Sequence, residues 1–62
     1  SNPDFVRFLY IAQGSTNELE THLVIANDLG FLPNETHQRL EPQIEEIRRM
    51  LNGLIHRLNS TK

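Results

Sequence analysis

Apolar residues recur at alternating steps of four and three along the first half of the chain. The repeat begins at Phe5 and ends at Ala26. Positions spaced in this way share one side of an α-helix, because a turn contains about 3.6 residues. The pattern predicts one long helix over about residues 4–29. Its apolar seam consists of Phe5, Leu9, Ala12, Thr16, Leu19, Leu23 and Ala26.

Three small residues, Gly14, Ser15 and Thr16, allow two interpretations of this helix. The tetrapeptide Ser-Thr-Asn-Glu at residues 15–18 matches a capping box, in which Gly14 ends one helix and Ser15 begins another. Alternatively, the helix continues, at a cost of about 1 kcal/mol for a glycine in its interior. The apolar seam keeps its phase across these residues, whereas a loop normally resets it. We therefore favour the continuous helix, with hydroxyls bonded to carbonyls one turn earlier.

A second repeat of the same period predicts a second helix over about residues 35–59. Pro42 lies inside it, where the missing N–H donor predicts a kink on the side opposite the seam. Asn52-Gly53 is a turn-forming pair, but the seam continues past it, so we expect helix there as well. This second seam consists of His37, Leu40, Ile44, Ile47, Leu51, Leu54 and Leu58.

The segment between the two repeats carries stop and start signals. Gly30 suits the left-handed conformation just past a helix end, and we expect Phe31 to fold back onto that end. Pro33 prevents the helix from continuing, and Asn34 is the expected N-cap of the next helix. Two helices of about 25 residues, each roughly 37 Å long, form an antiparallel hairpin when the link is short. The fold class is therefore all-α, with residues 1–62 as a single domain.

The apolar surface exceeds what one neighbouring helix covers, since a single neighbour covers a single stripe. On the first helix, four residues widen the seam: Phe8, Ile11, Ile25 and Leu29. Three more fall among polar residues on the opposite face: Val6, Tyr10 and Val24. A 62-residue chain is also marginal as a lone domain. We therefore expect self-association into a homodimer that completes a four-helix bundle. Its expected core is Phe5, Leu9, Leu19, Leu23, Ile44, Ile47, Leu51, Leu54 and Leu58.

Composition excludes several classes of protein. The chain has no cysteine, so disulfides and thiolate zinc sites are excluded. No apolar run approaches the ~20 residues that span a bilayer, and no signal segment opens the chain. We expect a cytoplasmic protein with no membrane partner.

No group of side chains indicates chemistry. His22 follows Glu18 by one turn, but a metal site needs three or four ligands and the spacing supplies no third. The three histidines are dispersed along two helices: His22, His37 and His56. Carboxylates such as Glu45 precede arginines such as Arg49 by four residues, which is typical of ion pairs on a solvated helix face. We expect no catalytic residue, no metal, no cofactor and no enzymatic activity.

The basic end of the chain is the one charge feature that suggests a ligand. The net charge of −2 argues against nucleic-acid binding by the whole molecule. From residue 47 onward, however, the charged residues are all basic: Arg48, Arg49, Arg57 and Lys62. They are candidate phosphate contacts of the kind that bind RNA without reading its sequence. The other interpretation is that they complement the negative end of the helix dipole.

Two stretches of the chain resemble a known bacterial family. The first is residues 5–32, and the second is EIRRMLNGLI at residues 46–55. They are similar to the second half of the four-helix-bundle proteins encoded in intervening sequences of 23S ribosomal RNA genes. The accessory variability determinant protein of diversity-generating retroelements is a relative of these proteins. The shared motifs are F-x-R-F-L at 5–9, G-S at 14–15, E-L-E-T at 18–21, L-G-F-L at 29–32 and R-M-L-N-G-L-I at 49–55.

The resemblance implies that residues 4–30 and 35–59 are the third and fourth helices of a four-helix bundle. The family's first two helices have no counterpart here, so we expect a fragment or a truncated member. The family forms ring-shaped pentamers, which makes a pentamer the alternative to a homodimer, and it has no known catalytic residues. We expect a non-enzymatic, self-associating module. The alternative is an RNA-binding accessory subunit, with RNA or a nucleoprotein as a weakly bound partner.

Overall fold

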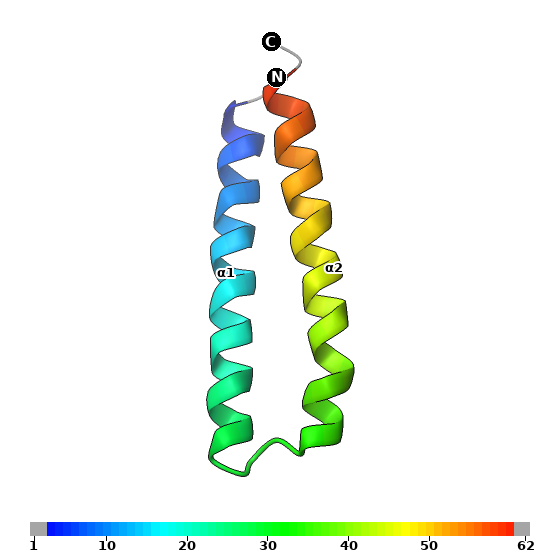
Figure 1. Cartoon of the computed structure of the whole chain (residues 1–62). Coiled ribbons are helices and arrows are strands. Elements are labelled where there is room, and N and C mark those ends of the chain that lie inside the picture. The colour runs from blue at the N-terminus through cyan, green and yellow to red at the C-terminus, as the bar shows by residue number, and fades with distance from the viewer. Residues whose placement is uncertain (1–2, 61–62) are drawn as a thin grey trace.

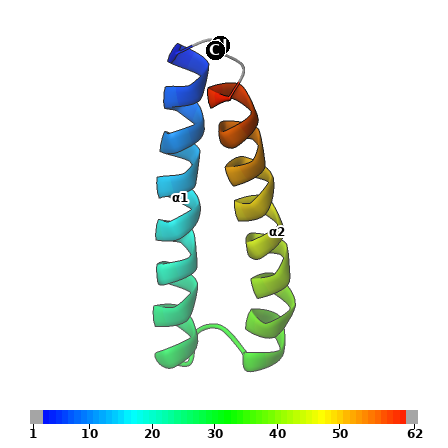
Figure 2. The same cartoon turned by 45° about the horizontal axis from the view of Figure 1, so that its top comes forward.

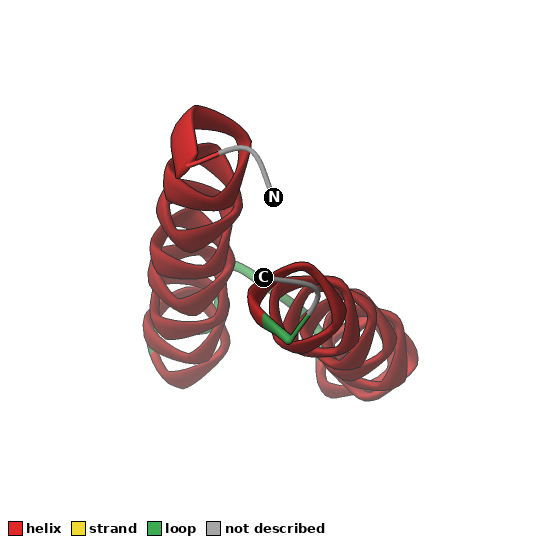
Figure 3. Cartoon of the chain, turned by 90° about the horizontal axis from the view of Figure 1, so that it is seen from above, coloured by secondary structure: helices red, strands yellow, loops and turns green. Residues whose placement is uncertain are grey.

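The protein is a hairpin of two long antiparallel helices. The structure, a computed structural model, describes residues 3–60. Helix α1 spans Pro3–Asp28 and helix α2 spans Asn34–Asn59. The helices lie side by side, joined by a short loop at one end of a rod that measures 47 × 16 × 10 Å (Figures 1 and 2). Seen from above, they are tilted relative to each other (Figure 3). The predicted all-α hairpin is confirmed, and each helix begins one residue earlier than predicted.

Helix α1 is continuous through Gly14, Ser15 and Thr16. The Thr16 Oγ1 donates to the Ala12 carbonyl oxygen at 2.8 Å, so this hydroxyl finds its partner one turn earlier in the same helix. A Cβ added at Gly14 would meet nothing within 4 Å, so the hairpin itself does not require glycine there. The continuous helix is confirmed, and the capping-box interpretation is wrong because seam residues on both sides of Gly14 keep the helix packed against α2.

The end of α1 is a complete Schellman motif. Gly30 has a φ of 84°, its N–H donates to the Asn27 carbonyl at 3.1 Å, and the Phe31 N–H donates to the Ala26 carbonyl at 2.9 Å. The prediction for Gly30 is confirmed. The Phe31 side chain is 82% exposed, so the expected packing of its ring onto the helix end is wrong. Only the Phe31 backbone returns to α1, and Leu32 is the half-buried side chain of the loop.

Helix α2 has Pro33 as its N-cap, which corrects the expected cap at Asn34. The Pro33 backbone is extended, and its carbonyl accepts from the His37 N–H at 3.0 Å. The Asn34 Oδ1 accepts instead from the Asn27 Nδ2 at 2.7 Å, and the same Nδ2 donates to the Leu32 carbonyl at 2.9 Å. Asn27 thus links α1 to the loop and to the start of α2. Because the Asn34 side chain is bonded to Asn27, it does not cap α2.

Helix α2 continues without interruption through Pro42 and through Asn52-Gly53. The predicted helix at Asn52-Gly53 is therefore confirmed. Pro42 is exposed and lies about half a turn away from the buried Ile44, because two residues rotate a helix by about 200°. A proline in this place loses no contact with α1, and its lost hydrogen bond faces solvent.

The contact between the two helices is thin. Three hydrophobic side chains among residues 3–60 are buried: Leu9, Ile44 and Ile55. Leu23, Leu51, Leu54 and Leu58 are half-buried. Ile55 was not part of the predicted seam, whereas Phe5, Leu19 and Ile47 of that seam are each 44–49% exposed in the hairpin. Residues next to the predicted positions therefore face α2 in several places.

Candidate functional site

The two long faces of the hairpin differ in chemistry. On one face, polar side chains of α1 bond to polar side chains of α2: Gln13 to Asn52, and Asn17 and Glu20 to Arg48. Successive helical residues are rotated by about 100°, so the residues one position before and one position after a buried residue lie on opposite long faces of the hairpin. Apolar residues occupy the long face opposite these polar contacts.

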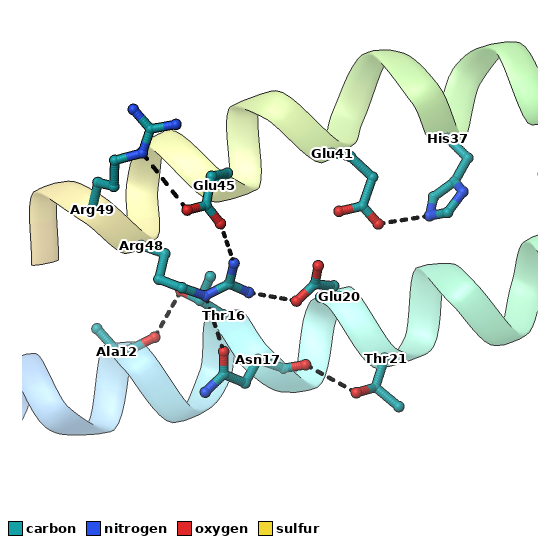
Figure 4. A network of polar contacts seen from close by, with 10 residues as sticks. All are labelled: Ala12, Thr16, Asn17, Glu20, Thr21, His37, Glu41, Glu45, Arg48 and Arg49. Atoms are coloured by element: carbon teal, nitrogen blue, oxygen red, sulfur yellow. Dashed lines mark hydrogen bonds and ion pairs between the residues drawn. The ribbon is translucent and has the colours of Figure 1, made fainter. Parts of the chain in front are cut away.

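Arg48 lies at the centre of the polar face, between the two helices (Figure 4). Its Nη1 donates to Glu45 Oε1 at 2.6 Å, its Nη2 donates to Glu20 Oε1, and its Nε donates to Asn17 Oδ1 at 3.4 Å. Glu20 and Asn17 belong to α1, and Glu45 belongs to α2. Hydrogen bonds to Glu45 and Glu20 raise the pKa of the Arg48 guanidinium above its ordinary value. Arg48 is therefore held by partners from both helices.

The four candidate phosphate contacts do not form one patch. A phosphate would have to displace two carboxylates to reach Arg48. The Arg49 side chain is 77% exposed, with its Nε 3.6 Å from Glu45 Oε2. Arg57 is exposed two turns further along α2, and Lys62 lies outside the described residues. Two of the four, Arg49 and Arg57, are therefore presented to solvent by the described part of the chain.

A shallow depression lies between these two arginines. It has a volume of about 330 Å³ and is lined by Arg49, Met50, Gly53, Leu54 and Arg57. Nothing within 4 Å would meet a Cβ at Gly53, so the absence of a side chain there leaves the helix backbone open. Sequence reasoning missed Met50 and Gly53 as lining residues. The available signal was their position in the sequence, because both residues lie between Arg49 and Arg57. The depression combines positive charge with an apolar lining.

The other long face carries large exposed apolar side chains from both helices. We call it the apolar face and define it by Phe5, Phe8, Leu19, Ile47 and Met50. Phe8 is 58% exposed and Met50 is 64% exposed. The Arg7 guanidinium lies 5.1 Å from the Phe8 ring centroid, within the range of a cation–π contact. A single hairpin therefore leaves this face uncovered.

Four residues that were expected to widen the α1 seam are exposed as predicted, and one other expectation is wrong. Phe8, Ile11, Ile25 and Leu29 are all exposed. Val6, however, is half-buried rather than exposed on the side opposite the seam. A seam with a period of 3.5 residues drifts around a straight helix of 3.6 residues per turn. Near the start of α1 this drift turns Val6 toward α2 and Phe5 away from it.

Titratable groups are scattered over the hairpin. Among residues 3–60, no three His, Asp or Glu side chains come together as a metal site would require. The His37 Nε2 lies 2.9 Å from Glu41 Oε2 on the same helix, which is an ion-pair distance within α2. His22 and His56 are exposed on different helices. Neither described helix is long and apolar enough to cross a membrane.

Comparison with known proteins identifies one family. A family model described as 23S rRNA-intervening sequence protein matches residues 1–53, which include α1, the loop and most of α2. No curated protein and no solved structure matches the chain. The matched range contains the motifs at 5–9, 14–15, 18–21 and 29–32 and most of the motif at 49–55, so the resemblance noted from these residues is confirmed.

Proposed function

Because the chain belongs to the 23S rRNA-intervening sequence protein family, we propose that it is a non-enzymatic helical module that associates with itself. The proposed assembly is a homodimer whose two hairpins form a four-helix bundle. The observation that carries this proposal is the apolar face, which one hairpin leaves open to solvent. The residues that would make the new core are those of the apolar face together with the half-buried leucines beneath it.

The energetics of the lone hairpin support association. Among the described residues, three hydrophobic side chains are buried, while eleven large hydrophobic side chains are exposed. Burying one such side chain contributes about 1.5–3 kcal/mol. A single core in a chain of this size supplies only about 3–5 kcal/mol of net stability. Covering a few half-exposed residues of the apolar face therefore contributes an amount of the same order as this net stability.

The chemistry of the surface supports a role without catalysis. The depression over Gly53 is lined by two arginines, a methionine, a glycine and a leucine, none of which is a general base or a nucleophile at neutral pH. Two carboxylates of the polar face, on Glu20 and Glu45, are bound by Arg48. Binding and assembly are the activities that this surface supports.

Matched substitutions on the two faces test self-association. Leu19 is 49% exposed on the apolar face, and Val24 is 40% exposed on the other side of the same helix. Leu19→Asp is expected to lower the mass measured by light scattering and the helicity measured by circular dichroism together, because folding and assembly are linked. Val24→Asp is expected to leave the mass unchanged. A wild-type chain that is a helical, cooperatively melting monomer at micromolar concentration would falsify the proposal.

A second candidate function is contact with RNA phosphates. Its supporting observation is the exposure of Arg49 and Arg57 on either side of the depression, in a part of α2 without acidic residues. Such contacts are electrostatic and must weaken steeply as salt is added. RNA that stays bound at high salt would point to a different mode of binding.

A further inference from the structure

We propose that the depression on α2 binds one unpaired base of single-stranded RNA, and that Arg49 and Arg57 bind the phosphates on either side of that base. The depression has a volume of about 330 Å³, and every residue that lines it belongs to α2. This inference rests on the second candidate function, contact with RNA phosphates, and adds the ligand that occupies the space between the two arginines.

The two arginines stand on one row of α2 with a glycine between them. Residues four apart lie one above another on a helix, so Arg49, Gly53 and Arg57 form a row. The row rises by about 12 Å from the first arginine to the second. Nothing lies within 4 Å of the position that a Cβ of Gly53 would take, so the row has an open gap in its middle. A ligand in this gap therefore has a positive charge at each end.

The row faces away from α1. Gly53 and Arg57 are each two residues from the buried Ile55, and two residues rotate a helix by about 200°. The Arg49 guanidinium also lies on the side of α2 that is turned away from α1 (Figure 4). Of the lining residues, Met50 alone belongs to the apolar face. Self-association through the apolar face therefore uses neither arginine.

The lining suits a flat aromatic ring with negative charge beyond its edges. Met50 and Leu54 form the apolar wall, and a thioether contacts aromatic rings favourably. Guanidinium groups stack on unpaired bases and also bind phosphates. The Arg49 Nε lies 3.6 Å from Glu45 Oε2, which is longer than a hydrogen bond, and Arg57 forms no ion pair with residues 3–60. Both guanidinium groups are thus available to phosphates.

The size of the depression favours a single base. Ligand pockets typically measure about 300–1,000 Å³, so this one is near the lower limit. In a duplex, neighbouring base pairs cover the faces of each base, whereas an unpaired base presents its face to a protein. A duplex would contact the arginines through its phosphates and leave the apolar wall uncovered. The combination of charge, apolar wall and small volume therefore favours single-stranded RNA.

Filling the gap tests this inference. Gly53→Gln places an uncharged side chain between the arginines, keeps both charges and replaces glycine by a better helix former, so the hairpin remains folded. Gly14→Gln is the matched control, because Gly14 also lies in a helix interior with nothing within 4 Å of its Cβ position. Fluorescence anisotropy measures binding of a short oligoadenylate and of inorganic polyphosphate, which has phosphates but no bases, at several salt concentrations. Circular dichroism checks the helicity of each variant.

We expect Gly53→Gln to weaken oligoadenylate binding about five- to tenfold, the lower end of what stacking of one base contributes. The salt dependence should stay the same, because both arginines remain. Polyphosphate binding by this variant should equal that of the wild-type chain, and so should oligoadenylate binding by Gly14→Gln. The wild-type chain should also bind the single strand more tightly than a duplex of the same length.

Two results would overturn the base site and leave the phosphate contact intact. One is unchanged oligoadenylate binding by Gly53→Gln together with weaker binding when Arg49 and Arg57 are both replaced by glutamine. The other is an equal loss of oligoadenylate and polyphosphate binding in Gly53→Gln, because the added side chain would then disturb only the phosphates. A wild-type chain that binds neither probe at low salt would remove the second candidate function and the base site with it.

Discussion

Arg48 of α2 forms an ion pair with Glu20 of α1, and its other amino group is held by Glu45 of its own helix. The Arg48 side chain is only one-quarter exposed, although the residue lies among those that would otherwise form a basic patch. The contact links the middle of one helix to the middle of the other on the polar face. It also separates Arg48 from the arginines that remain available to a ligand.

Replacing Arg48 should lower the stability of the hairpin. In Arg48→Met the two carboxylates of Glu20 and Glu45 lose the guanidinium that both of them bind. We expect a lower melting temperature by circular dichroism at fixed protein concentration. The control is Arg49→Met, the same substitution at a 77% exposed side chain with one long contact, which should change the melting temperature less. An equal change in both variants would mean that the interhelical contact adds nothing.

Two glycines should respond in opposite directions to the same substitution. Gly14→Ala is expected to raise the free energy of unfolding by up to about 1 kcal/mol, because Gly14 is in a helix interior and its Cβ would meet nothing within 4 Å. Gly30→Ala is expected to lower it by about 1–2 kcal/mol, because Gly30 has a φ of 84°. Urea denaturation at matched concentration measures both values. A destabilised Gly14→Ala variant would reveal a close neighbour that the single hairpin lacks.

RNA binding, if measured, should depend on Arg49 and Arg57 and less on Arg48. Each phosphate contact on single-stranded nucleic acid contributes about 0.7 to the slope of log K against log salt, so Arg49→Gln with Arg57→Gln should flatten that slope by about 1.4. Arg39→Gln, near the loop end of α2, is the control and should leave the slope unchanged. Unchanged binding in the double variant would place the contact elsewhere on the molecule.

Chelators should leave the stability of the assembly unchanged. No three potential ligands come together within the described residues, so a metal could be held only between copies of the chain. Thermal melting with and without an excess of a chelator, at a concentration where the chain is associated, measures this. A lower melting temperature in the presence of the chelator would reveal a site shared between chains, since metal binding stabilises the state that contains the site.

The sequence alone determined the number, length and pairing of the helices. These features follow from local physics, namely the period of the apolar residues and the backbone preferences of single residues. Continuity at Gly14 followed from the unbroken phase of the seam, and the end of α1 followed from the left-handed conformation that Gly30 tolerates. Neither feature needs knowledge of what the helix packs against.

Tertiary structure alone decided which of two neighbouring residues faces the other helix. The apolar stripe on each helix is wider than one neighbour covers, and a seam of 3.5 residues drifts around a helix of 3.6, so sequence spacing leaves the choice between Val6 and Phe5 open. Packing also gave two polar side chains hydrogen-bond partners that local sequence rules do not predict. Asn34 bonds to Asn27 instead of capping α2, and Arg48 reaches across to Glu20 instead of remaining free in solvent. Such choices depend on how the two helices are placed, because a side chain takes a distant partner only when the fold brings that partner within reach.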